Sequence, residues 1–158
     1  MIRKTILLIL WITLSYMSTA YARQNMETFQ NEEIVKFVLQ NNLQAVERLL
    51  KTGTAVNTRG EEGRSLLLLA TREGLADMAK LLVSFDANVN QQDDIGDSPF
   101  LYAGATGQTE LVKLFLANGA RFNIFNRYNG TALIPACERG HIETVRLLAQ
   151  TKGFQSIT

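Results

Sequence analysis

The sequence has very few of the side chains that carry metal and nucleophilic chemistry. It contains one cysteine and one histidine in 158 residues. A single cysteine cannot form an internal disulfide, and a single histidine rules out a site built on a histidine pair or on a Cys/His cluster. Cys137 lies beside Ala136 on the apolar side of a predicted helix, so we interpret it as a small buried hydrophobic residue. His141 is close in sequence, but the intervening Gly140 is a predicted helix stop, and the two side chains therefore do not share one helical face.

Catalytic motifs are also missing. The sequence contains no Walker-type phosphate loop, no G-x-S-x-G and no dinucleotide fingerprint. Two pairs of adjacent acids, Glu61-Glu62 and Asp93-Asp94, fall on predicted turns. Such pairs could act as acid and base or bind a hard cation, but adjacent acids on a turn are more often simply solvated, and the spacing does not match an EF-hand. We therefore predict a non-enzymatic protein with no cofactor and no metal.

Neither sign of charge is in excess. The chain has 16 Lys and Arg against 15 Asp and Glu, a net charge of +1. Arg3 and Lys4 supply two of the positive charges, and residues 1–22 contain no acid, so residues 23–158 carry a net charge of −1. A nearly neutral body gives no electrostatic reason to expect a nucleic acid as partner.

An apolar run long enough to span a membrane is absent as well. The N-terminus has the three parts of a secretory signal peptide: a basic start, an apolar core at residues 6–14, and the small-x-small ending Ala20-Tyr21-Ala22. We predict cleavage after Ala22 and export to the periplasm of a Gram-negative bacterium, with no membrane association afterwards. The alternative is an uncleaved membrane anchor, but the apolar core is shorter than the roughly 20 residues that a spanning helix needs.

The remaining sequence repeats itself every 33 residues. Four sets of residues recur at this spacing: Gly74, Gly107 and Gly140; Ala70, Ala103 and Ala136; Ser65, Ser98 and Thr131; Asn57, Asn90 and Asn123. A fixed period of this length is the signature of a repeat architecture, in which each copy is one supersecondary unit.

Residues 91–123 show what one unit is. "DDIGD" is typical of a turn, and Ser98-Pro99 is typical of a helix start, with serine as the N-cap and proline at the first helical position. Gly107 ends this helix, a second helix begins near Thr109, and Gly119 stops it. Each helix pair has apolar residues on both sides, which only stacked copies can bury. The sequence therefore predicts an all-α solenoid of about four helix–turn–helix repeats, joined by β-turn or hairpin segments that we call fingers.

These motifs resemble the ankyrin repeat. The resemblance rests on "GDSPFLYAGATGQTELVKLFLANGARFN", on "GTALIPACERGHIETVRLLAQ" and, more loosely, on "GRSLLLLATREGLADMAKLLVSFDANVN". The sequence departs from the family in having Leu68, Leu101 and Ile134 where ankyrin repeats have a histidine. Asp86 and Asn129 replace turn glycines; both residue types tolerate left-handed backbone, so we expect the turns to persist.

The repeat pattern sets the expected boundaries. A linker at 23–31 follows the signal peptide of residues 1–22, and a C-terminal tail occupies 154–158. Between them we predict a degenerate first repeat at 32–57 and three further repeats at 58–90, 91–123 and 124–153.

The two ends of the array differ. The first copy has polar residues available for an outer face: Glu32, Glu33, Lys36, Gln40 and Gln44. In the last copy we find no further helix to cover Val145 and Leu148. Because solenoids need polar terminal faces, we expect either a frayed last repeat or self-association through that end.

The family resemblance implies a binding surface, made of the finger tips and the exposed side of the first helices. The tips are Arg59, Glu61, Glu62 and Arg64; Gln92, Asp94, Ile95 and Asp97; and Phe125, Arg127 and Tyr128. The first helices add Arg72, Tyr102, Thr106, Glu138 and Arg139. Aromatic residues and arginine are enriched at interaction hot spots, which favours the third finger; the alternative is that Phe125 packs on the neighbouring finger and Tyr128 covers it.

The resemblance thus implies an exported module that binds another protein, whose identity the sequence does not give. A second hypothesis is an immunity or inhibitor protein that uses the same surface to neutralise an exported toxin or hydrolase. A third, protection against oxidative stress through a redox partner, finds no redox residue beyond Cys137.

Overall fold

A computed structural model describes the backbone of residues 2–151 and the side chains of residues 17–151. This part of the chain contains eight α-helices and no β-strand. The helices are α1 (Ile2–Leu39), α2 (Leu43–Lys51), α3 (Leu66–Arg72), α4 (Ala76–Ser84), α5 (Pro99–Ala105), α6 (Thr109–Ala117), α7 (Leu133–Glu138) and α8 (Ile142–Gln150), with a short 3₁₀ turn, η1 (Glu61–Gly63).

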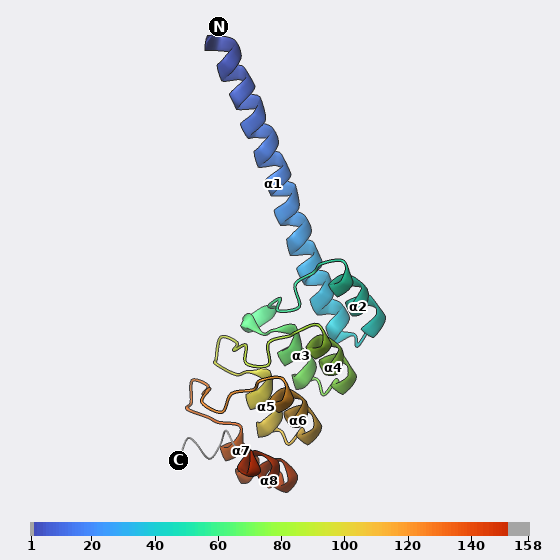
Figure 1. Cartoon of the computed structure of the whole chain (residues 1–158), viewed down its shortest axis with the longest axis vertical. Helices are drawn as coiled ribbons and strands as arrows, with labels where there is room; N and C mark the ends of the chain where they lie inside the picture. The colour runs from blue at the N-terminus through green and yellow to red at the C-terminus, as the bar shows by residue number, and fades with distance from the viewer. Residues whose placement is uncertain (1, 152–158) are drawn as a thin grey trace.

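The helices stack as antiparallel pairs in a single column (Figure 1). One row contains the C-terminal part of α1 followed by α3, α5 and α7, and the second row contains α2, α4, α6 and α8. Neighbouring members of each row pack on one another, α3 on α5 and α5 on α7 in the first row, and α4 on α6 and α6 on α8 in the second. The loops between successive pairs all project on the same side of the column. The predicted all-α repeat solenoid is therefore confirmed.

Helix α1 is longer than one repeat requires. It runs without interruption from Ile2 to Leu39, so residues 23–31, which we predicted as a linker, are helical. The sequence from Ile2 to Leu39 contains no glycine or proline that would break a helix. Ile34 and Val38 at its C-terminal end are fully buried, and this end serves as the first helix of the first repeat.

The rest of α1 projects from the column (Figure 1). Among the side chains that the structure describes in this part, four large apolar ones are exposed: Met17, Tyr21, Met26 and Phe29. Within the part of the chain that the structure describes, no helix is both long enough and apolar enough to cross a membrane. Cleavage after Ala22 stays a prediction.

Ser65 and Ser98 are the N-caps of α3 and α5, and Thr131 makes the same bond from one residue before the N-cap of α7, Ala132. Each side-chain oxygen accepts a hydrogen bond from the backbone N–H three residues ahead: Leu68 N to Ser65 Oγ at 3.1 Å, Leu101 N to Ser98 Oγ at 3.2 Å and Ile134 N to Thr131 Oγ1 at 3.3 Å. Helix starts leave such N–H groups without partners in the helix, and these caps satisfy one in each. Asp86 and Asn129 have positive φ angles of 62° and 55°, which confirms that they replace glycine in left-handed turns.

The recurring asparagines tie each repeat to the next. Asn57 Oδ1 accepts from the backbone N–H of Asn88 at 2.8 Å, and one repeat later Asn90 Oδ1 accepts from Arg121 N at 2.9 Å. The amide of Asn90 also donates to the carbonyl of Gly119 at 2.9 Å. The 33-residue spacing of Asn57 and Asn90 therefore has a structural reason, since both bond to the closing turn of the following copy.

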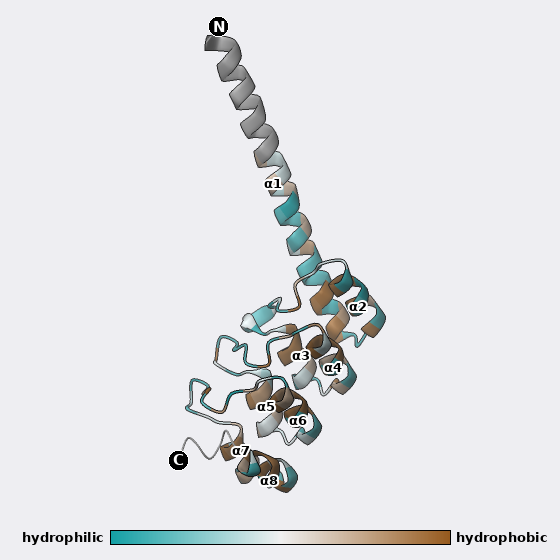
Figure 2. Cartoon of the chain, viewed as in Figure 1, coloured by the Kyte–Doolittle hydropathy of each residue, from teal (hydrophilic) through white to brown (hydrophobic). Residues whose placement is uncertain are grey.

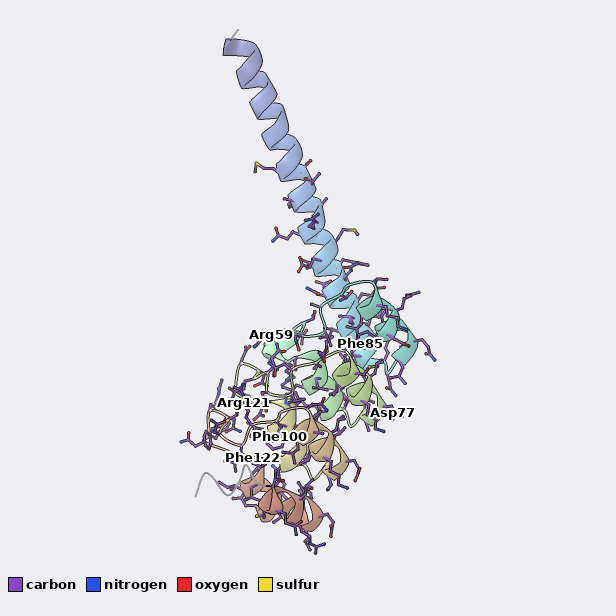
Figure 3. The ribbon with its side chains drawn as sticks, in the orientation of Figure 1. Arg59, Asp77, Phe85, Phe100, Arg121 and Phe122 are labelled. Carbon is purple, nitrogen blue, oxygen red and sulfur yellow. The ribbon has the colours of Figure 1, made fainter. Side chains whose placement is uncertain are left out.

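The core runs the length of the column, between the layers. Figure 2 shows apolar residues concentrated on the inner sides of the helices in every layer. Phe115 is fully buried, and Phe100 is 1% exposed. The Phe100 ring meets that of Phe122 edge to face, with centroids 5.5 Å apart (Figure 3). This edge-to-face contact is a favoured aromatic geometry.

The last repeat corrects two of our expectations. Leu148 is fully buried, because it faces α6 rather than the outside of the column. Cys137, which we interpreted as buried, is exposed. Its counterparts Thr71 and Gly104 are covered by the following repeat, whereas in the described part of the chain no helix packs on that face of α7. Ile134 and Ile142 are 53% and 67% exposed in the same repeat.

The first repeat largely meets our expectation of a polar outer face. Four of its five polar residues are exposed, namely Glu32, Lys36, Gln40 and Gln44, and Glu33 is half-buried.

We predict that Gly104→Ala destabilises the protein. Alanine normally stabilises a helix relative to glycine by about 1 kcal/mol. Here, however, the added Cβ would lie 2.5 Å from Cβ of Ala132, on the adjacent repeat. Overpacking of this kind costs about 1–3 kcal/mol, so the denaturation midpoint should fall. Gly60→Ala, whose Cβ would meet nothing closer than 3.4 Å, is the matched control, and a raised midpoint for Gly104→Ala would contradict the close packing.

Candidate partner-binding surface

Three fingers lie side by side along one side of the column (Figure 1). They occupy residues 57–65, 90–98 and 123–131, which link α2 to α3, α4 to α5 and α6 to α7. The predicted site residues are on these fingers, and stacking of the helix pairs brings the fingers together although they are 33 residues apart in sequence.

Backbone hydrogen bonds join the tips. Asp94 N donates to the carbonyl of Glu62 at 3.1 Å, and Arg127 N donates to the carbonyl of Ile95 at 2.9 Å. Since these two bonds are one repeat apart, each tip is fixed to the previous one in the same way. The tips form a continuous edge rather than three independent loops.

Fingers 2 and 3 are held in shape by a side chain at the same position of each repeat. Asp93 Oδ1 accepts from Ile95 N at 3.0 Å and from Asp97 N at 2.8 Å. Asn126 Oδ1 accepts in the same way from the N–H groups two and four residues ahead, at 3.0 Å and 2.8 Å. Such turns, closed by an Asp or Asn side chain, rigidify a loop. Finger 1 has Gly60 at this position and contains η1. Its backbone bond from Gly60 N to Arg64 O at 2.8 Å also occurs in the other two fingers, from Asp93 N to Asp97 O and from Asn126 N to Gly130 O.

Two of the predicted site residues hold neighbouring fingers together. The amide of Gln92 donates to Gly96 O at 2.6 Å within its own finger and to Phe125 O at 2.8 Å on the next one. Asp97 Oδ1 accepts from the side-chain amide of Asn126 at 2.9 Å. Sequence reasoning placed Gln92 and Asp97 at the tips but gave no sign of these bonds, because the partners belong to another repeat.

The third finger presents two aromatic side chains to solvent. Phe125 is 45% exposed and Tyr128 is 74% exposed. Tyr128 therefore does not form a closed cover over its neighbours. The guanidinium of Arg127 donates to the carbonyl of Asp94 at 2.8 Å, so this arginine braces finger 3 against finger 2.

The charges of the first two fingers are partly engaged within the protein. Arg59 Nη1 donates to the carbonyl of Gly63 at 3.1 Å, and Arg64 forms an ion pair with Glu62. Glu61 and Asp94 are exposed, and Ile95 is half-buried.

The first helices add an aromatic and two arginines to the same side. The guanidinium of Arg72 lies over the ring of Tyr102, 4.8 Å from its centroid, a cation–π arrangement between successive repeats. Arg139 Nη1 donates to the carbonyl of Ala105 at 2.6 Å. Next to them is a hollow of about 180 Å³, whose lining includes Tyr102, Thr106 and Arg139.

No metal-binding cluster occurs among the described residues, as no group of three His, Cys, Asp or Glu side chains converges there. The ring of His141 packs closely on Gly107, where an added Cβ would lie 2.5 Å from it. This contact gives the histidine a packing role between the third and fourth repeats.

Comparison with protein families identifies the repeat. A model described as ankyrin repeats in three copies matches residues 85–157, and a model of a single ankyrin repeat matches residues 62–94. Together the two matches cover more than half of the chain.

Similar proteins carry the same repeat. The chain is 30% identical over 114 residues to the ankyrin repeat protein YahD of Escherichia coli (strain K12), covering 72% of this chain and 57% of that protein. It is 40% identical over 112 residues to ankyrin repeat domain-containing protein 63 of Mus musculus, covering 68% of this chain and 29% of that protein. The chain thus spans less than two thirds of the length of both relatives.

Solved structures agree with the fold. The ankyrin repeat protein EF0377 has a TM-score of 0.69 and 38% identity. An ankyrin repeat domain from Acinetobacter baumannii AYE, ABAYE2397, has a TM-score of 0.70 and 41% identity. Both matches cover 73% of this chain and 59% of the compared chain.

We predict that Gln92→Ala loosens finger 3 without unfolding the column. The variant removes one hydrogen bond within finger 2 and one between the fingers, each worth about 1 kcal/mol. Amide hydrogen exchange at Arg127 and Asn129 should become roughly fivefold faster or more, while exchange in α5 and α6 stays unchanged. Tyr128→Ala, which removes an exposed ring, serves as the control; equal exchange in both variants would contradict a bracing role for Gln92.

Proposed function

The chain belongs to the ankyrin-repeat family, and on that premise we propose that it binds a partner protein through its concave face and finger tips. Ankyrin repeats are generally protein–protein interaction modules. The proposed role is non-enzymatic: the column supplies a rigid, extended surface, and the partner supplies any chemistry.

One observation supports the third finger as the centre of this surface. Phe125 and Tyr128 are exposed on a turn that is fixed at both ends, by its own asparagine cap and by backbone and side-chain bonds to finger 2. Large aromatics on a rigid support lose little conformational entropy when a partner covers them, which is why such residues dominate binding energy. Arg127 serves this site indirectly, by holding the finger in place.

We propose further that the protein acts in the periplasm after cleavage following Ala22. The support is the three-part N-terminal sequence. A periplasmic inhibitor or immunity protein would use the same surface, and stoichiometric inhibition of a single captured enzyme would distinguish that role from a scaffold.

The test is affinity capture from periplasmic extract with the purified protein and two double variants. Phe125→Ala/Tyr128→Ala removes the exposed rings, and Lys113→Ala/Arg146→Ala alters exposed residues on α6 and α8, away from the fingers. A specific partner should be retained by the wild type and the second variant and lost from the first. Retention by all three would place the site elsewhere, and retention by none would count against the binding role.

We also propose that a second copy of the chain covers the exposed face of the last repeat. Ile134 and Cys137 lie there, at positions whose counterparts in the interior repeats are buried, and Ile142 of the same repeat is 67% exposed. Burying the two isoleucines would stabilise a dimer by the hydrophobic effect.

This self-association should depend on Ile134 and Ile142. In sedimentation velocity over a wide concentration range, the wild type should shift from monomer to dimer, and Ile134→Glu/Ile142→Glu should stay monomeric. Leu39→Glu, at an exposed apolar position near the other end of the array, should behave as the wild type does. A wild type that remains monomeric at every concentration would exclude the dimer.

A further inference from the structure

A second hollow lies where α1 passes finger 1, at the opposite end of the finger row from Phe125. It has a volume of about 530 Å³. Its lining comes from two segments: Thr28, Asn31, Glu32 and Val35 of α1, and Arg59, Gly60 and Glu61 of finger 1. Arg59 is labelled in Figure 3, close to the base of the projecting part of α1.

Finger 1, which forms one wall of this hollow, departs from the repeat pattern. Gly60 stands where fingers 2 and 3 have Asp93 and Asn126, whose side chains close their own turns. Glycine at this position is not required by the backbone, since Gly60 has φ −92° and ψ −154°, which other residues also adopt. An added Cβ would lie 3.4 Å from Val35 and 3.5 Å from Leu69, which is ordinary contact. Gly60 therefore places no side chain on this wall of the hollow, although the backbone there does not require glycine.

The polar groups around this space are only partly used by the protein itself. In the described part of the chain, the exposed carboxylates of Glu32 and Glu61 make no ion pair or side-chain hydrogen bond. Asn31 accepts from the hydroxyl of Thr58 at 3.1 Å through Oδ1, which leaves its amide hydrogens available. Arg59 is the one cation in the lining, and its guanidinium already donates to Gly63 O.

We propose that this hollow accepts a lysine or arginine side chain of the partner protein. The aliphatic stem lies on Val35 and the backbone of Gly60, and the cationic head meets the carboxylates of Glu32 and Glu61 from the two sides. Carboxylates outnumber cations in the lining by two to one, and a partner cation would give both acids the pairing that they lack. This inference rests on the proposed function, and it adds a charge requirement to the partner.

The competing occupant is an acidic side chain paired with Arg59. That guanidinium is already bonded to Gly63 O, and the same lining contains two carboxylates, so an incoming acid would meet repulsion from them. A site for a basic side chain should bind small basic peptides and not acidic ones, and a site for an acidic side chain should do the opposite.

The experiment titrates the ¹⁵N-labelled protein with three tripeptides blocked at both ends, Gly-Arg-Gly, Gly-Lys-Gly and Gly-Glu-Gly, and follows backbone amide shifts. The two basic peptides should give saturable shifts at Asn31, Glu32, Gly60 and Glu61, and the acidic peptide should give none. The shifts should be lost in Glu32→Gln/Glu61→Gln and kept in Glu110→Gln/Glu143→Gln, which neutralises two exposed acids on α6 and α8.

A third variant closes the hollow and leaves its charges in place. Gly60→Asn introduces the side chain that finger 3 has at this position, so it should fold with an unchanged or higher Tm and lose the shifts. Shifts with Gly-Glu-Gly, no shifts with either basic peptide, or basic-peptide shifts that survive Gly60→Asn would each overturn the inference.

This outcome is separable from that of the proposed function. If a partner is captured through Phe125 and Tyr128 while the basic peptides give no shifts, only the charged hollow is wrong. If the basic peptides bind but no partner protein is captured, the hollow stands and the proposed function fails.

Discussion

The structure depends on one constraint: the interior helix pairs have an apolar surface on each side, and only another pair can cover it. The short helices α3, α5 and α7 have six or seven residues each, too few to be stable alone in water. They persist because each has residues buried against its neighbours, among them Leu67 in α3, Phe100 in α5 and Ala136 in α7. The last repeat has one apolar surface that a neighbouring pair covers and one that stays exposed. Leu148 faces α6 and is fully buried, whereas Ile134, on the other face, is 53% exposed.

Stacking at this fixed repeat also determines the fingers. Once the helix pairs are in register, the closing asparagines Asn57 and Asn90 lie opposite backbone N–H groups of the next copy. The tips meet in the same register through Asp94 N and Arg127 N. Backbone groups away from helices and sheets need partners, and here each repeat supplies those of its neighbour. The bonds between successive repeats therefore make the proposed binding surface rigid, and no additional structural element is needed for this.

Sequence reasoning succeeded where the chemistry is local. The N-caps at Ser65 and Ser98, the left-handed turn at Asp86 and the 33-residue period each depend on residues a few positions apart or on direct repetition, so the fold followed from them. It failed where the partner comes from another repeat. The roles of Gln92 and Arg127 are set by carbonyls about 33 residues away, which no local pattern reveals. Cys137 was misplaced for a related reason, because an amphipathic pattern shows which face a neighbour would cover but not whether a neighbour is there.

The same division suggests where specificity resides in such a protein. Positions that follow the repeat are occupied by stacking and finger-to-finger bonds, and they are alike in every copy, so they cannot distinguish one partner from another. Side chains at positions that depart from the repeat are not needed for stacking or for the bonds between fingers. Gly60 breaks the pattern set by Asp93 and Asn126 and lines a hollow against α1. Phe125 and Tyr128 break it at the other end of the finger row by placing exposed rings where polar residues would suffice. The column provides rigidity through its regularity, and recognition is expected where that regularity is interrupted.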